Sequence, residues 1–181
     1  MHVPVEAHPT DRFNVEIKAR CARLDEVRAI LMRAGADARG ADAQTDTYFV
    51  VPRGRLKVRE GSIENALIAY ERPDEPGAKP CEVRMTELDP ESSGPLRELL
   101  EAALPVRVQV RKRREILFIA NVKFHLDQVE GLGTFVEIEA QSRGGAPERA
   151  VLEAQAAEWR ARLGIADADL EPRSYSDLLT V

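Results

Sequence analysis

Strict alternation of charged and apolar residues along several short segments is the feature that most constrains how this chain can fold. The pattern is clearest in NVEIKAR (residues 14–20), GRLKVRE (54–60), VKFHLDQ (122–128) and FVEIEA (135–140). Alternate side chains of a β-strand point to opposite faces of its sheet. The segments therefore predict a sheet with one apolar face on a core and one charged face whose surroundings have to be identified.

The other segments complete an α+β chain of short strands interrupted by three helices. Further strands are expected at residues 46–51, 66–73, 79–88 and 106–120, and helices at 24–35, 95–103 and 147–163. Short turns rich in Pro, Gly and Asn separate several of the strands. About eight strands joined by short turns predict a meandering antiparallel sheet that can close into a barrel.

Size and composition place the chain among ordinary one-domain proteins. Its 181 residues carry a net charge of −5, which argues against a general nucleic-acid binder. We expect a loose tail over residues 1–12 and a single domain over 13–181. No apolar run is long enough to span a membrane and no signal peptide is evident. Cys21 and Cys81 form neither a disulfide framework nor a metal spacing, so a cytoplasmic protein with reduced thiols is expected.

The charged faces admit two interpretations. A sheet face in water often carries alternating charges, and for any single strand this is the simpler explanation. However, the charges are segregated into a basic pair, Lys57 and Arg59, and an acidic pair, Glu137 and Glu139. If the sheet curls with this face inward, the carboxylates need a cation such as Mg²⁺ or Mn²⁺, and the basic groups need an anion such as a polyphosphate. In VRKRRE, periodicity leaves open which pair shares that face: Lys112 with Arg114, or Arg111 with Arg113.

Several motifs in their order along the chain resemble the CYTH superfamily, which contains class IV adenylyl cyclases, thiamine triphosphatases and related triphosphate tunnel enzymes. The motifs are NVEIK, TDTYFVVPRGRLKVRE, YERPD, VRKRRE, HLDQVEGLGTFVEIEA and SYSDLL. The resemblance extends from residue 14 to about residue 179, and within the superfamily it is strongest to class IV cyclases and cyclase-like proteins.

The resemblance implies a closed antiparallel barrel with a charged lining that forms the active site. The implied ligands of a Mg²⁺ or Mn²⁺ ion are Glu16, Asp127, Glu137 and Glu139. The implied phosphate-binding residues are Lys18, Lys57, Arg59, Arg72, Lys112, Arg114 and His125. For His125, a role as a satisfied barrel histidine is an equal alternative. The implied catalytic residues are Lys18, Arg59 and Arg114, which would stabilise charge on the phosphates, and Asp127, one of two candidate bases.

One position departs from the family pattern. Asn14 stands where the E-x-E-x-K strand of the family has its first glutamate. An amide oxygen can still bind a cation, but it adds no negative charge, so weaker metal binding is expected.

The resemblance implies an enzyme acting on a small-molecule triphosphate, with ATP as the first candidate. The net charge and the lack of a long apolar run argue against nucleic-acid and membrane partners. The leading hypothesis is a cyclase that converts ATP to cyclic AMP and pyrophosphate. The alternatives are a triphosphatase acting on tripolyphosphate, thiamine triphosphate or a nucleoside triphosphate, and a non-catalytic polyphosphate or nucleotide binder. An exposed barrel wall or the C-terminal helix would also be compatible with a homodimer.

Overall fold

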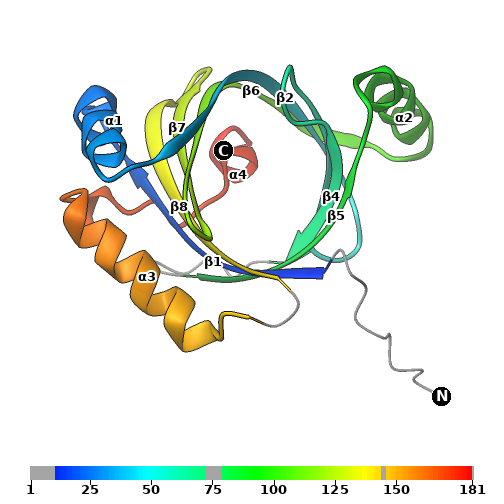
Figure 1. Ribbon diagram of the computed structural model, residues 1–181. Helices are drawn as coiled ribbons and strands as arrows, with labels where there is room; N and C mark the ends of the chain where they lie inside the picture. The colour runs from blue at the N-terminus through cyan, green and yellow to red at the C-terminus, as the bar shows by residue number, and fades with distance from the viewer. Residues whose placement is uncertain (1–10, 72–78, 144–145, 181) are drawn as a thin grey trace.

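Eight antiparallel strands close into a ring, with helices on its outside (Figure 1). The computed structural model describes residues 11–71, 79–143 and 146–180. The order around the ring is β1-β5-β4-β3-β2-β6-β7-β8. The strands are β1 (Asp11–Arg20), β2 (Asp37–Phe49), β3 (Arg55–Glu60), β4 (Ala66–Glu71), β5 (Lys79–Glu87), β6 (Val106–Ile119), β7 (Val122–Val129) and β8 (Gly133–Arg143). The helices are α1 (Leu24–Arg33), α2 (Pro90–Ala103), α3 (Arg149–Arg162) and α4 (Tyr175–Leu178), with a 3-10 turn at Asp167–Asp169. The predicted α+β fold with a closed antiparallel sheet and flanking helices is confirmed.

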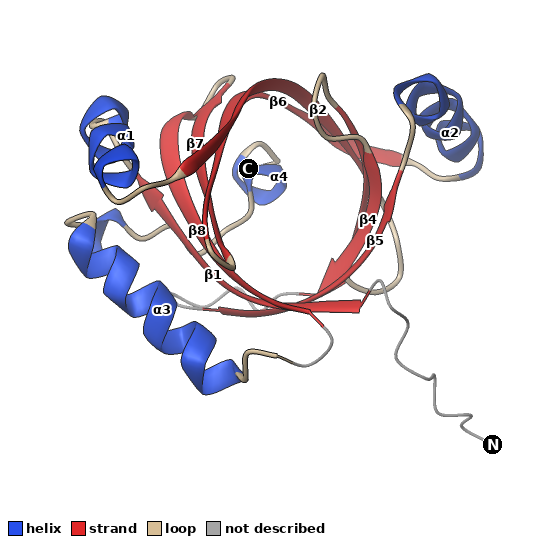
Figure 2. Ribbon diagram, in the orientation of Figure 1, coloured by secondary structure: helices blue, strands red, loops and turns tan. Residues whose placement is uncertain are grey.

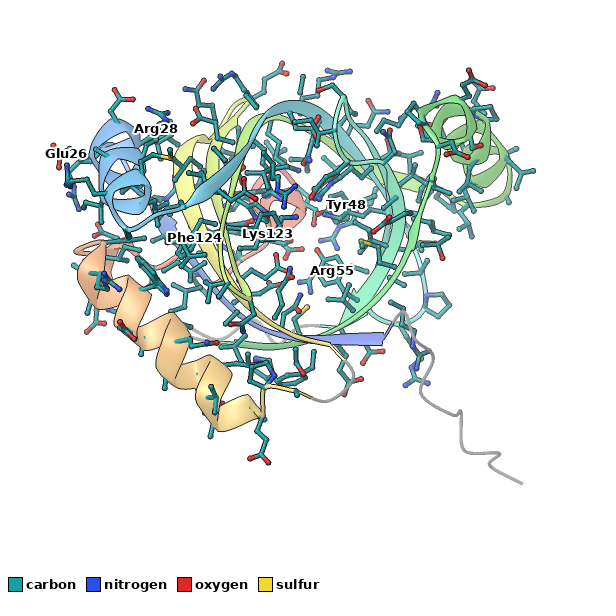
Figure 3. All side chains as sticks on the ribbon, viewed as in Figure 1. Glu26, Arg28, Tyr48, Arg55, Lys123 and Phe124 are labelled. Atoms are coloured by element: carbon teal, nitrogen blue, oxygen red, sulfur yellow. The ribbon has the colours of Figure 1, made fainter. Side chains whose placement is uncertain are left out.

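The main apolar core lies outside the ring, between the sheet and two helices. Helices α1 and α3 cover the outer face of β1, β7 and β8, whereas α2 lies on the opposite side (Figure 2). Phe124 is fully buried there and packs edge-to-face on Trp159 of α3, with 5.0 Å between ring centroids. Figure 3 shows Phe124 on this outer face and its neighbour Lys123 on the inner face. The apolar residues of the alternating strands thus face helices, and the charged residues face the inside of the ring.

Two elements differ from the sequence-based expectation. Helix α2 begins at Pro90, which occupies the first helical position, so Pro95 lies inside the helix and not at its start. Pro95 has no N–H to donate to the carbonyl of Glu91, and Glu91 is exposed to solvent. Strand β2 begins at Asp37, well before the expected residue 46. Its alanines, glycine and aspartates have low strand propensity, and the strand forms because it pairs with β6 along its length.

Helix α4 lies across one opening of the ring when the barrel is viewed along its axis (Figure 1). Ser174 caps this helix, and its hydroxyl accepts a hydrogen bond from the N–H of Asp177. The carboxylate of Asp177 in turn accepts hydrogen bonds from Arg55 of β3 at 2.9 Å and Arg107 of β6 at 2.7 Å. The C-terminal segment is thereby fastened to two strands of the barrel. Within the described ranges, no helix has both the length and the apolar character needed to cross a lipid bilayer.

Candidate functional site

The inside of the barrel encloses a cavity of about 420 Å³. Its walls carry the inward-facing side chains of the alternating strands, and Tyr175 of α4 closes one end. Acidic and basic side chains from the strands and from the hairpin loop between β3 and β4 line it: Glu16, Lys18, Asp46, Lys57, Arg59, Glu64, Glu87, Lys112, Arg114, Lys123, Glu137 and Glu139. The charged face predicted from the alternation therefore points inward, as the second interpretation requires.

Three cations share one carboxylate on the wall formed by β2, β3 and β6. Asp46 accepts hydrogen bonds from Lys57 at 2.8 Å, from Nε of Arg59 at 2.8 Å and from Lys112 at 2.6 Å. Burial alone would raise the pKa of Asp46, but the three surrounding charges hold it well below its usual value. Arg59 also pairs with a second carboxylate, that of Glu64, and the close grouping of three cations is an arrangement that suits an anion with several charges.

Lys112 is the most deeply buried cation of this cluster, with 1% of its side chain exposed. Burial, together with the neighbouring charges of Arg114, Arg59 and Lys57, lowers its pKa to about 7 despite the contact with Asp46. An anion bound in the cavity would favour the protonated form of Lys112 and raise its pKa.

A second network joins β6, β7 and β8 around Arg114. Its guanidinium donates to both carboxylate oxygens of Asp127, at 2.7 and 2.5 Å, and to Glu137 at 2.7 Å. Tyr175 also donates to Asp127, at 2.8 Å. Asp127 is fully buried behind these two groups, so it orients Arg114, and it is not among the described residues that line the cavity.

His125 lies beside this network. Its Nδ1 is 3.1 Å from Glu137, while Nε2 is buried and has no hydrogen-bond partner among the described residues. Burial, with Arg114 and Lys123 nearby, lowers the pKa of His125 below its usual value, which favours the neutral ring at physiological pH. Lys18 lies on the other side of Glu137, with Nζ 3.7 Å from a carboxylate oxygen and 4.1 Å from the centroid of the Tyr175 ring.

The carboxylates of the acidic wall lie on β1 and β8. Glu16 and Glu139 are directly opposite in the strand pairing, and Glu137 follows on the same face. Asn14 donates to Glu139 at 2.5 Å, and its own side-chain oxygen is buried without a donor among the described residues. Within the described part of the chain, no three Asp, Glu, His or Cys side chains converge closely enough to enclose a metal ion on their own. The donors still fit a hard cation such as Mg²⁺, which is held by one or two carboxylates and keeps several waters.

Sequence reasoning missed three acidic residues of the site, Asp46, Glu64 and Glu87. Glu64 lies in the β3–β4 hairpin, accepts a hydrogen bond from Arg59 at 2.9 Å and forms an ion pair with Lys123 of β7. The hairpin is held by the buried carboxylate of Asp42, which accepts from the backbone N–H groups of Ser62, Ile63 and Glu64 at 2.6–3.0 Å. Asp42 thus fixes the position of Glu64 without lining the cavity itself.

The structure brings together nearly all of the residues proposed from the sequence. Lys112 and Arg114 point inward and are buried, whereas Arg111 and Arg113 are exposed on the outer face. Glu16, Lys18, Lys57, Arg59, Lys112, Arg114, His125, Glu137 and Glu139 all line the cavity. Arg72 and most of the expected tail (residues 1–10) lie outside the described residues, while residues 11 and 12 belong to β1.

Known proteins share this architecture and part of this sequence. The family model described as the CYTH domain matches residues 12–175. Adenylate cyclase CyaB of Aeromonas hydrophila is 29% identical over 184 residues, which cover 94% of this chain and 91% of that protein. The PH1012 protein of Pyrococcus horikoshii OT3 has a TM-score of 0.77 and 27% identity, covering 91% of this chain and 98% of that one. HpAC1 of Hippeastrum, reported to have a dominant triphosphatase activity, has a TM-score of 0.63 at 13% identity and covers 93% of each chain, which shows a shared fold only. This chain belongs to the CYTH family.

Proposed function

We propose that this protein is a divalent-metal-dependent adenylyl cyclase of the class IV type, which converts ATP to cyclic AMP and pyrophosphate. The observation that carries the proposal is the cluster of Lys57, Arg59 and Lys112 on the single carboxylate of Asp46. A cluster of three cations on one wall of the cavity suits a polyanion, and the carboxylates on the facing wall suit the cation that accompanies a triphosphate. The choice of ATP is supported by the similarity to CyaB over nearly the whole chain.

The proposed reaction is the attack of the ribose 3′-oxygen on the α-phosphorus, with cleavage of the bond to the pyrophosphate oxygen. Arg59, Lys112 and Arg114 line the cavity, and we assign them to stabilise the charge that develops on the phosphates. Asp127 keeps Arg114 oriented toward the cavity. Burial favours the neutral ring of His125, and its Nε2 has no hydrogen-bond partner among the described residues, so we assign His125 to accept the hydroxyl proton.

A bound Mg²⁺ or Mn²⁺ would supply charge stabilisation on the phosphate oxygens. Glu16 and Glu139 would hold it, with Asn14 contributing a neutral oxygen. Glu137 borders the same wall but is engaged by Arg114 and His125. We also propose that the protein works in the reducing cytoplasm, because its two cysteines are buried and are not joined in a disulfide.

Phosphorus NMR tests the proposed reaction. The protein would be incubated separately with ATP and with tripolyphosphate, each in Mg²⁺ and in Mn²⁺. We expect cyclic AMP and pyrophosphate from ATP. Release of orthophosphate from either compound would identify a triphosphatase. Unchanged spectra of both compounds, with binding still measurable by calorimetry, would identify a non-catalytic binder.

A further inference from the structure

Most of the inner face of β4 and β5 is apolar, in contrast to the charged lining elsewhere in the cavity; the exceptions are Tyr70 of β4 and Glu87 at the end of β5. We call this face the inner apolar wall; its residues are Ala66, Ile68, Cys81, Val83 and Met85. The outer face of the same strand β5 is polar and exposed, with Glu82, Arg84 and Thr86 turned to solvent. On β5 the alternation is therefore reversed relative to β1, β7 and β8.

The inner apolar wall belongs to neither of the two apolar core clusters of the described structure. The core cluster under α1 and α3 contains the outward apolar residues of β1, β7 and β8, and the cluster at the α4 end is built around Tyr48, Phe135 and Tyr175. Ile68 is buried, while Val83 and Met85 are partly exposed and border the cavity. A partly exposed apolar surface inside a charged cavity gains stability when an apolar group of a ligand covers it.

The inner apolar wall lies next to the cations that would bind phosphates. In the strand pairing, Ile68 is directly opposite Lys57, and Ala66 is directly opposite Arg59. Met85 is opposite Ile68 on the next strand. A ligand with its phosphates on Lys57 and Arg59 would therefore bring the group attached to those phosphates onto β4 and β5.

We propose that the inner apolar wall is the binding subsite for the organic group of a triphosphate ester, specifically for the apolar face of a nucleobase. This proposal rests on the proposed function, because it takes the cation cluster as the phosphate site. Inorganic tripolyphosphate would leave the wall uncovered, and the cavity of about 420 Å³ is within the range of pockets that enclose organic ligands. The wall thus selects nucleoside triphosphates over inorganic polyphosphate.

The test compares two ligands on one variant. Calorimetry in Mg²⁺ would measure the affinity for α,β-methylene-ATP, in which pyrophosphate cannot leave, and for tripolyphosphate. The variant Met85→Ala removes about 40 Å² of apolar contact, so we expect affinity for the ATP analogue to fall about fivefold. Affinity for tripolyphosphate should change by less than about twofold, because tripolyphosphate does not reach β5.

Thr86→Ala is the matched control, since Thr86 is adjacent in the strand but lies on the exposed outer face. It should change neither affinity. If Met85→Ala weakens both ligands equally, or leaves the ATP analogue unaffected, the subsite is overturned while triphosphate binding stands. If the unaltered protein binds neither ligand, the proposed function is overturned and the subsite with it.

Discussion

Replacing Asp46 with asparagine tests whether the cations around this carboxylate form a binding site for an anionic ligand. The amide would keep an acceptor oxygen but lose the negative charge. In the unaltered protein, Lys57, Arg59 and Lys112 each donate to that carboxylate at 2.6–2.8 Å. Removing one partner of a buried ion pair destabilises a protein by about 3–5 kcal/mol. We expect the lower end, about 3 kcal/mol, because Lys112 can lose its proton and relieve part of the repulsion. For a chain of this size, that loss corresponds to a fall in melting temperature of about 6–12 °C.

The same substitution should strengthen ligand binding. A carboxylate in the cavity repels phosphate, so its neutralisation should tighten tripolyphosphate binding by about tenfold at low salt. Melting curves with and without tripolyphosphate would measure both effects in one assay, because a ligand that binds only the folded state raises its stability. Asp25→Asn is the control, since Asp25 is 95% exposed in its side chain and pairs only with the surface residue Arg28 among the described contacts. It should change stability by less than about 0.5 kcal/mol.

The pH dependence of the Asp46→Asn variant follows from Lys112. Its pKa is about 7 in the folded protein and near 10.5 when unfolded, so the unfolded chain binds more protons between these values. Over that window, this group makes the unaltered protein more stable as pH rises. Loss of the Asp46 charge would lower the pKa of Lys112 further and move the lower edge of the window to more acidic pH. The reasoning would be refuted if Asp46→Asn left the melting temperature unchanged or weakened tripolyphosphate binding. Either result would show that Asp46 does not neutralise cations that bind phosphate.

Three further substitutions test other parts of the site. Glu139→Gln should abolish metal-dependent turnover while melting stays cooperative; retained turnover would remove Glu139 from the metal site. Asn14→Glu should tighten Mn²⁺ binding in calorimetry, and unchanged affinity would show that Asn14 does not face the ion. Gly61→Ala should lower the unfolding free energy by about 1–3 kcal/mol in urea titration, because the added Cβ would lie 2.7 Å from an oxygen of Asp42. Gly94→Ala, in a helix with its nearest atom at 3.6 Å, should be neutral or stabilising, and equal losses in both glycine variants would contradict the steric argument.

Much of the fold was predictable because it depends on local periodicity. Alternation identified the strands of the charged face, and the turn residues near Gly54 and Gly131 marked their ends with backbone that adopts positive φ. The long strand β2 was largely missed because its residues favour other conformations and become a strand only through pairing with β6. That pairing joins positions about 70 residues apart, and no local signal reports it.

Site residues could be predicted only where the alternation of side chains along a strand shows which of them share a face. In VRKRRE, consecutive charged residues carry no apolar marker, so periodicity alone did not decide which of them point inward. Asp46 and Tyr48 are two positions apart, so they share one face of the strand. That spacing was the one feature of the sequence that indicated an inward-facing Asp46. Glu64 lies in a hairpin whose conformation depends on Asp42, a residue of another strand. Its place beside Lys123 follows from tertiary structure and from nothing in its own neighbourhood of the sequence.

Alternation establishes that a strand has two different faces, but it does not establish which face is inside. On β1, β7 and β8 the apolar residues face helices and the charges face the cavity, whereas on β5 the order is reversed. The inward charges remain compatible with a stable fold because carboxylates of the chain itself, such as Asp46 and Glu64, pair with the cations. A ligand must compete with these carboxylates for the same cations. The binding free energy therefore depends on how much more strongly the cations interact with a phosphate than with an internal carboxylate. This difference in interaction strength is greatest for an anion that carries several charges at once.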